Sequence, residues 1–149
     1  MLAVVPLHVR QDAAQATQLT GLEAEMKERV AELVGDRARS MWVSTFHSAC
    51  VRILRQEAVR LGYSNSFTIY DSSDSLRLLS TIMKDMHLDS KQYTPRAVHS
   101  MISTAKNELM GPADFPLQAA DAFQQIVAEI FALYQRRLQS ANAMDFDDL

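Results

Sequence analysis

The stretch YTPRAVHSMISTAKNEL, residues 93–109, shows the pattern that decides the fold class. Thr94 is a typical helix N-cap, because its hydroxyl can accept a hydrogen bond from a first-turn amide, and Pro95 suits the first helical position. Apolar residues then recur at spacings of four and three on one helical face: Val98, Ile102 and Ala105. The stretch therefore predicts an amphipathic helix that packs this face into a core.

Four further segments of the 149-residue chain show the same helical period. Their predicted bounds are Leu22 to Gly35, Ser48 to Gly62, Ser75 to Met86 with Asp71 or Ser72 as cap, and Leu117 to Ser140. The chain has only four glycines and four prolines, few for a sandwich or barrel with many tight turns. We therefore expect a mainly α fold of about five helices.

Three short stretches favour extended backbone: Leu2–Val5, Met41–Ser44 and Ser66–Asp71. One to three isolated strands do not make a stable sheet by themselves. We therefore expect the first two to belong to a parallel sheet whose other strands lie outside this chain.

Composition excludes several classes of protein. The single cysteine, Cys50, rules out an internal disulfide and a multi-cysteine metal site, and it fits a reducing, cytoplasmic setting. No apolar run reaches about 18 residues, so no membrane span is expected. Residues 1–10 lack a basic region before their apolar run and make a poor signal peptide.

The charge is uneven along the chain. Residues 1–60 hold eight basic and seven acidic side chains, a balance of +1, whereas residues 61–149 hold seven and eleven, a balance of −4. A net charge of −3 is not typical of a nucleic-acid binder. Any DNA contact must therefore depend on local groups.

The stretch MWVSTFHSAC, residues 41–50, gathers reactive side chains. One interpretation is catalysis by His47, Ser48 or Cys50, although no Gly-rich nucleophile elbow surrounds them. A second is structural, with a strand end, a helix cap at His47 and Ser48, and a buried Cys50. A third is an anion site at Thr45, His47 and the first amides of the following helix.

Two other clusters carry charge. Asp145, Asp147 and Asp148 offer three carboxylates, which are typical ligands of a divalent metal ion. However, no Gly-bearing calcium loop is present, and Asp145 is predicted to be a helix N-cap. Lys106 lies near a predicted helix end, where a cation is favourable anyway. No Gly-rich phosphate loop ending in Lys-Ser or Lys-Thr occurs, so we expect no nucleotide cofactor, metal or catalytic residue in this chain.

Several of these stretches resemble one family in their order and spacing. MKERVAELVG, MWVSTFHSACVRILRQEAVRLGYSNSFTIYDSSDSLRLL, YTPRAVHSMISTAKNEL and YQRRLQSANAMDFDDL are together similar to superfamily 1 DNA helicases of the UvrD/PcrA/Rep type, from about Met26 to Leu149. STFHS resembles the motif named Ib, and AKNEL and DFDDL resemble two further signatures. The likeness points to the bacterial UvrD/PcrA branch.

The resemblance implies a domain layout. That family has two RecA-like motor domains, 1A and 2A, with insertions 1B and 2B, and binds ATP and Mg²⁺ between the motor domains. By resemblance, residues 1–62 are part of 1A, residues 63–143 form a helical 1B subdomain, and residues 144–149 return to 1A. Residues 6–22 lack the family's motif Ia, so its DNA contacts cannot be carried over.

The resemblance also implies sites and partners. The residues implied to contact DNA are Thr45, Phe46, His47 and Ser48 along the single-strand track and Thr104, Lys106 and Asn107 near the duplex. The expected function is a DNA-binding accessory part of an ATP-dependent helicase acting in repair or replication, inactive by itself. Its expected partners are single-stranded and forked DNA and the remaining domains 1A, 2A and 2B. The alternative is a helical protein–protein interaction module without DNA binding, possibly self-associating.

Overall fold

The computed structural model describes residues 12–118 and 120–149, so the predicted strand at Leu2–Val5 lies outside the described residues. The chain divides into two compact units, residues 1–50 and 51–149, which are described separately here. The fold is mainly α, with five α-helices and two short strands among the described residues. The predicted fold class is confirmed.

The first unit contains one long helix and the start of another. Helix α1 (Asp12–Val34) is followed by a 3₁₀ turn, Gly35–Ser40, and Gly35 takes a φ of 63° that favours glycine. The predicted stop at Gly35 is confirmed. The apolar face of α1 is not covered by the described part of this unit, since Leu33 is 84% exposed and Met26 is exposed as well.

The predicted strand at Met41–Ser44 has no partner strand among the described residues. Residues 42–45 have no regular structure and lead directly into α2 (Phe46–Glu57), which crosses from the first unit into the second. The residue types favour extended backbone, but a strand also needs a hydrogen-bonded neighbour. The sheet in the described residues contains only β1 and β2, neither of which pairs with this segment.

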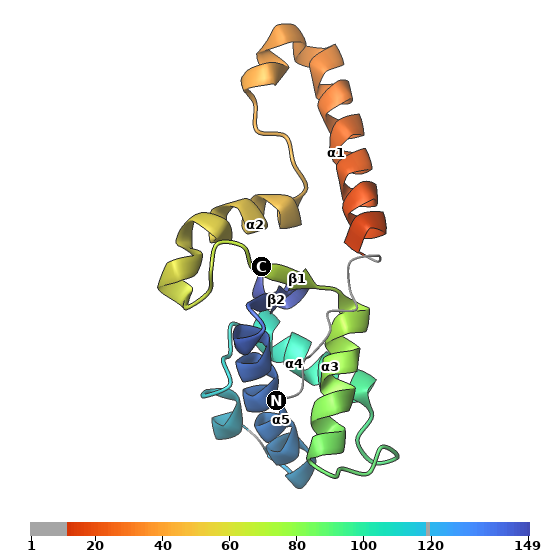
Figure 1. Cartoon of the computed structure of the whole chain (residues 1–149), viewed down its shortest axis with the longest axis vertical. Helices are drawn as coiled ribbons and strands as arrows, with labels where there is room; N and C mark the ends of the chain where they lie inside the picture. The colour runs from red at the N-terminus through yellow and green to blue at the C-terminus, as the bar shows by residue number, and fades with distance from the viewer. Residues whose placement is uncertain (1–11, 119) are drawn as a thin grey trace, which may run out of the picture. The chain divides into compact units, whose positions relative to one another are not determined.

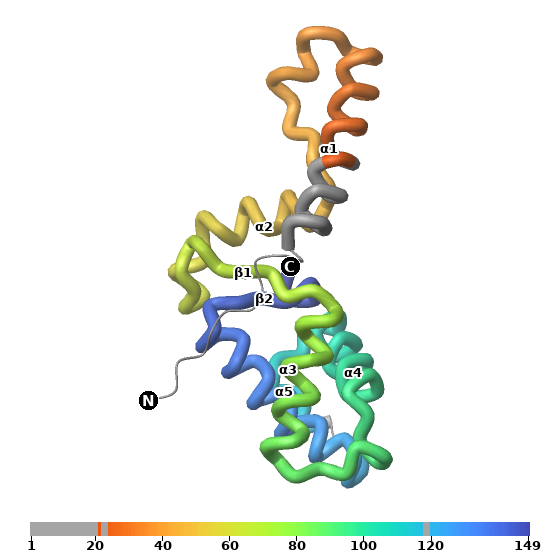
Figure 2. Tube along the Cα trace, turned by 45° about the vertical axis from the view of Figure 1, so that its right-hand side comes forward, coloured from red at the N-terminus to blue at the C-terminus, as the bar shows by residue number. Residues whose placement is uncertain are grey.

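The second unit is a helical body built on a two-stranded sheet. Its elements after α2 are a 3₁₀ turn at Ala58–Leu61, β1 (Thr68–Tyr70), α3 (Ser72–Asp85), α4 (Pro95–Asn107), a 3₁₀ turn at Phe115–Gln118, α5 (Ala122–Ser140), β2 (Ala143–Asp145) and a final 3₁₀ turn at Phe146–Asp148. Figures 1 and 2 both show α3, α4 and α5 side by side, with β1 and β2 at one end of them.

The helix caps follow the sequence closely. Asp71 accepts a hydrogen bond from the amide of Asp74 at the start of α3, and Thr94 accepts one from the amide of Ala97 at the start of α4. Helix α5 begins at Ala122, five residues later than predicted, because Asp121 caps it and Pro116 lies in a separate 3₁₀ turn. Capping chemistry therefore sets these starts more sharply than the apolar period does.

The main core lies between α3, α4 and α5. Its central side chains are buried almost completely: Leu79, Ile82, Val98, Ile102, Val127, Ile130, Phe131, Tyr134 and Leu138. A second, smaller cluster joins Ala58, Phe67 and Met144. The predicted inward face of α4, at Val98, Ile102 and Ala105, is confirmed.

Strands β1 and β2 are parallel neighbours although more than 70 residues separate them. Thr68 pairs with Ala143, Ile69 with Met144 and Tyr70 with Asp145. The extended stretch at Ser66–Asp71 is thus confirmed, whereas β2 is an element that the sequence pattern did not predict. This pairing brings Asp145 to the end of the helical core.

Candidate functional site

The first group of predicted site residues lies in the first turn of α2. The Thr45 hydroxyl donates to the Ser48 hydroxyl at 2.9 Å and accepts from the Ser48 amide at 3.3 Å, so Thr45 caps the helix. The structural interpretation of this stretch placed the cap two or three residues later, at His47 and Ser48. Here His47 and Ser48 occupy the first turn instead.

The side chains of this turn differ in exposure. Phe46 is 76% exposed and meets the exposed His47 ring edge-on, with centroids 6.1 Å apart. Cys50 is a free, half-buried thiol. Since the Ser48 hydroxyl is bonded to Thr45, the turn presents an aromatic pair beside a positively polarised helix start. Such a surface suits a phosphate flanked by a base or sugar.

The second group lies in the last turn of α4, in the other unit. Thr104 and Asn107 are exposed, and their side chains donate to the carbonyls one turn earlier, Ser100 at 2.9 Å and Ser103 at 2.8 Å. As exposed residues, both keep acceptor oxygens that these contacts do not use, and such oxygens accept hydrogen bonds from water or a ligand. They are therefore available for a polar contact on the outside of the helix.

Lys106 points the other way, into the body of the second unit. Its side chain is only 7% exposed, and its Nζ atom donates to Asp145 Oδ2 and to Asp148 Oδ1, both at 2.8 Å. A phosphate contact would have to compete with these two short ion pairs. The prediction that Lys106 contacts DNA stays a prediction, but the structure gives its charge other partners.

The two aspartates form a compact acidic turn. Asp145 caps the final 3₁₀ turn by accepting from the Asp148 amide at 3.0 Å, and Asp148 accepts from the Asp145 amide at 3.0 Å, a reciprocal capping box. The predicted N-cap role of Asp145 is confirmed. Within residues 12–118 and 120–149, no group of three or more His, Cys, Asp or Glu side chains is placed to hold a metal ion.

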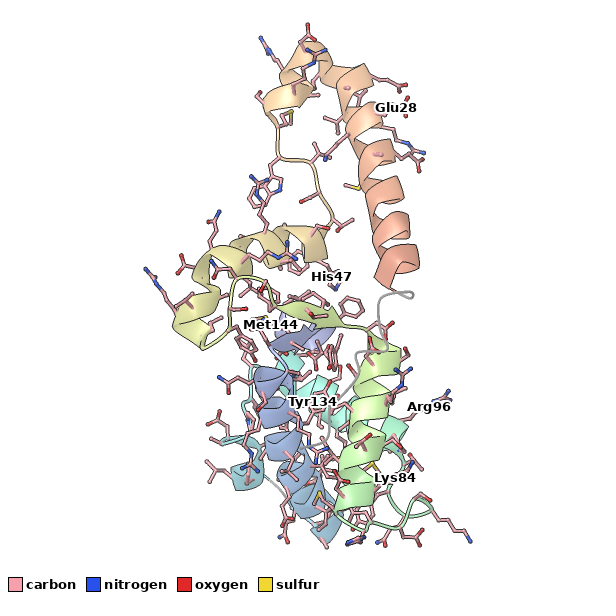
Figure 3. All side chains as sticks on the ribbon, viewed as in Figure 1. Glu28, His47, Lys84, Arg96, Tyr134 and Met144 are labelled. Carbon is pink, nitrogen blue, oxygen red and sulfur yellow. The ribbon has the colours of Figure 1, made fainter. Side chains whose placement is uncertain are left out.

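Helix α5 completes the network from its own side. The Tyr134 hydroxyl donates to Asp145 Oδ2 at 2.8 Å, and Gln135 Nε2 donates to Asp148 Oδ1 at 3.2 Å. The Lys106 ammonium also lies 5.3 Å from the centroid of the Tyr134 ring. Figure 3 shows Tyr134 inside the helical body, near the strands. We call Lys106, Tyr134, Gln135, Asp145 and Asp148 the lysine network.

The pKa values in the lysine network diverge for physical reasons. Burial opposes the charge of Asp145, but the Lys106 ammonium and the hydrogen bonds from Lys106 and Tyr134 hold its pKa below the ordinary value. Burial and the adjacent charge of Asp145 raise the pKa of Asp148 despite Lys106. Burial and Asp145 also raise the pKa of Tyr134, which therefore stays a protonated donor.

The network was hidden from sequence reasoning. Lys106 is separated from its acidic partners by 39 and 42 residues, and no helical spacing links such positions. Its members come together because β2 returns beside β1 and so places Asp145 against α4 and α5. The stretches AKNEL and DFDDL carry them, but nothing in either stretch indicates that they meet.

A comparison with protein families now gives the site a context. Residues 22–149 match the model described as the UvrD/REP helicase N-terminal domain. The chain belongs to this family. The match begins at residue 22, so most of the atypical segment, residues 6–22, lies outside it. In residues 12–118 and 120–149, no helix is both long and apolar enough to cross a bilayer.

Individual UvrD/REP family members are similar over most of this chain. The chain is 51% identical over 130 residues to the ATP-dependent DNA helicase UvrD1 of Mycobacterium tuberculosis. The aligned region covers 85% of this chain and 17% of that relative. The chain is 49% identical over 125 residues to the ATP-dependent DNA helicase PcrA of Staphylococcus aureus, covering 84% and 17%. The chain thus spans about a sixth of the length of these relatives.

Proposed function

We propose that this chain is the DNA-contacting 1B region, with flanking parts of 1A, of a bacterial, cytoplasmic ATP-dependent DNA helicase that unwinds duplex DNA in repair or replication. The observation that carries the proposal is the 51% and 49% identity to two proteins named as ATP-dependent DNA helicases. The family match over residues 22–149 supports it.

The topology supports the assignment of residues 63–143 as an insertion. The helical body leaves the sheet after Tyr70 and returns at Ala143, and these two points lie on adjacent parallel strands. An inserted subdomain must begin and end at neighbouring positions of its host. The segment 144–149 then continues into the 1A domain, and residues 1–62 belong to 1A as well.

ATP and Mg²⁺ do not fit the residues of this chain. Its glycines, at positions 21, 35, 62 and 111, are not followed by Lys-Ser or Lys-Thr, so no phosphate loop is encoded. Lys106, which a phosphate could otherwise attract, is paired with Asp145 and Asp148. We propose that nucleotide chemistry belongs to other parts of the helicase, and that this chain alone neither hydrolyses ATP nor unwinds DNA.

The DNA contacts that we propose divide into two surfaces. At the start of α2, Thr45, Phe46, His47 and Ser48 hold the sugar-phosphate backbone of the single strand. At the end of α4, Thr104 and Asn107 face the duplex from an exposed turn. Lys106 acts behind them by fixing the end of α4 against Asp145 and Asp148, whereas its direct contact with phosphate would require these ion pairs to open.

Filter binding of labelled single-stranded and forked DNA at low salt tests this function. The whole chain is expected to bind weakly and to lose affinity as salt rises, since phosphate contacts release counterions. The variants His47→Ala and Asn107→Asp should each weaken binding relative to the original chain, the first through a lost contact and the second through repulsion of phosphate. Gln125→Glu is the control for Asn107→Asp, because it adds one negative charge at another exposed position of the second unit.

The result that would contradict this proposal is equally specific. DNA affinity that does not change with salt would contradict phosphate contacts at both surfaces. Equal affinity of His47→Ala, Asn107→Asp and the control would likewise show that neither surface contacts DNA. Binding by Lys106→Ala as tight as by the original chain would assign Lys106 to the lysine network alone. Light scattering in the same samples separates DNA binding from self-association without a DNA response.

A further inference from the structure

A pocket of about 250 Å³ lies on the second unit, away from the lysine network. Its floor is apolar and comes from Met101 and Ala105 of α4, Met110 of the following loop and Phe115 of the 3₁₀ turn. Its rim is polar and includes Ser100, Thr104 and Glu108. Gln124, in the first turn of α5, also lines the pocket.

The end of α4 shapes this pocket. The amide of Leu109 donates to the Lys106 carbonyl at 2.9 Å and that of Met110 to the Ala105 carbonyl at 2.9 Å, the bond pattern of a Schellman motif. Leu109 takes the left-handed position, with φ of 59°. The turn sends Met110 into the floor and Leu109 into solvent, where it is 93% exposed.

The size of the pocket limits what it can hold. Pockets for drug-sized ligands and cofactors usually measure roughly 300–1,000 Å³. A space of about 250 Å³ with a floor of two methionines and a phenylalanine suits one or two apolar side chains. Phe115 is held in place by an edge-on contact with the buried Phe131, at 6.1 Å between centroids, so the floor is preformed.

Apolar side chains also stand beside the pocket. Leu109 lies between the lining residues Glu108 and Met110, and Leu117, 85% exposed, follows Phe115 by two residues. A leucine in left-handed backbone is disfavoured relative to glycine or asparagine. Two leucines exposed to this extent around an apolar pocket are typical of a protein interaction site.

The charge around the pocket selects the partner. Residues 107–135 contain four carboxylates, Glu108, Asp114, Asp121 and Glu129, and no lysine or arginine. All four are exposed. The basic side chain of Arg96 lies one helical turn before Ser100 and outside the lining, and it extends outward in Figure 3. Such a surface repels phosphate and attracts cations.

We propose that this pocket docks an apolar side chain of a basic protein segment, with a lysine or arginine of that segment paired to Glu108. The apolar anchor fills the space above Met101, Met110 and Phe115, while Leu109 and Leu117 cover its flanks. The pocket shares Thr104 with the α4 surface proposed above to face duplex DNA, so the segment and the duplex would compete for the end of α4.

Selection of peptides displayed on phage against the whole chain tests this proposal. The enriched peptides are expected to share an apolar residue with a lysine or arginine within a few positions. One such synthetic peptide is then titrated by fluorescence anisotropy. Glu108→Lys and Ser100→Trp should each weaken its binding by about tenfold, by charge reversal and by filling the pocket.

The variants are chosen to keep the fold. Lysine at position 108 suits the C-terminus of α4, and Ser100 is exposed. Leu109→Asn gives a residue that tolerates left-handed backbone, and it should still weaken the peptide by about threefold or more through loss of an exposed contact. Glu57→Lys, at an exposed position of α2 outside both the lining and residues 107–135, should leave affinity within about twofold.

Two results would overturn the proposal. One is a selected consensus that is acidic or lacks an apolar residue, or no consensus at all. The other is peptide affinity that does not change in Ser100→Trp, Glu108→Lys and Leu109→Asn. A DNA titration of the same variants keeps the proposals distinct, since Glu108→Lys should weaken the peptide without weakening forked DNA.

Discussion

Helices α1 and α5 both carry apolar residues on one face, but these faces lie in different environments. In α5 the stripe packs against α3 and α4, and Ile130, Phe131 and Tyr134 are almost completely buried. In α1 the apolar face that contains Met26 and Leu33 stays exposed in the described part of its unit. The comparison teaches that a helical apolar period predicts the face of a helix that can be buried, whereas burial depends on a partner element.

The largest effect is expected in the core around α5. Phe131→Ala removes a buried ring that meets Phe115 edge-on, and it should lower the free energy of unfolding by about 4 kcal/mol, since it leaves a cavity. Urea unfolding followed by circular dichroism measures the change. A decrease in the free energy of unfolding of less than about 1 kcal/mol would mean that the apolar face of α5 is packed no better than the apolar face of α1.

A somewhat smaller effect is expected in the lysine network. Lys106→Met keeps the length of the side chain but leaves the buried Asp145 and Asp148 without their cation, and it should cost about 3 kcal/mol at neutral pH. The same urea experiment tests it. Lys84→Met, on the last turn of α3 and exposed, is the matched control and should change stability little. Equal stability of the two variants would contradict a structural role for the lysine network.

The pH dependence of stability sharpens this result. The pKa of Asp145 is lowered by folding, so its contribution to stability is present above its unfolded value near 3.9 and is lost as pH falls through the lower folded value. Asp148 behaves oppositely, because its raised pKa makes stability decline as pH rises from the unfolded to the folded value. Asp145→Asn should therefore flatten the acid loss, which urea unfolding between about pH 2.5 and 7 measures.

A moderate effect is expected where α5 ends. Asn142 has a φ of 50°, and its side chain accepts from the Ser64 amide at 2.7 Å and donates to the Ser64 hydroxyl at 2.6 Å. Asn142→Ala should cost about 1–2 kcal/mol through both the backbone and the hydrogen bonds. Asn142→Gly keeps the backbone freedom and should recover part of the loss. Equal losses in the two variants would assign the whole effect to the side chain.

The smallest effect is expected on α1. Leu33→Ala removes a side chain that is already 84% exposed, and alanine favours the helix, so the change should lie within about 0.5 kcal/mol. Thermal unfolding measured by circular dichroism checks this. A larger loss would show that the α1 face is covered in solution, for example by a second copy of the chain, and sedimentation would then reveal the dimer.

The sequence predicts the parts of the fold that depend on local signals. The caps at Asp71 and Thr94 and the inward face of α4 are predicted correctly, because each depends on residues within one or two turns. β2 is missed, and Met41–Ser44 forms no strand within the described residues, because strand formation depends on a distant neighbour. Local pattern therefore sets the helices, and chain topology sets the sheet.

The candidate site divides in the same way. The helix start at Thr45 to Ser48 follows from local residue types, although the cap is Thr45 itself. The partners of Lys106 do not follow from local residue types, since a cation near a helix end is equally compatible with solvent, phosphate or a buried carboxylate. Only the return of the chain at β2 decides among these for the structure described here.

The parallel pairing of β1 and β2 limits how far the protein can be trimmed. Antiparallel neighbours can be joined by a two-residue turn, but parallel neighbours need a crossover of about a dozen residues or more. A shortened version that keeps the pairing of Tyr70 with Asp145 must therefore retain roughly one helix of the connection. Helix α5 is the natural one to keep, since it leads directly into β2 and brings Tyr134 to Asp145. Removing α3 or α4 would expose the core face of α5, and removing α4 would also take away Lys106, so the connection tolerates little shortening.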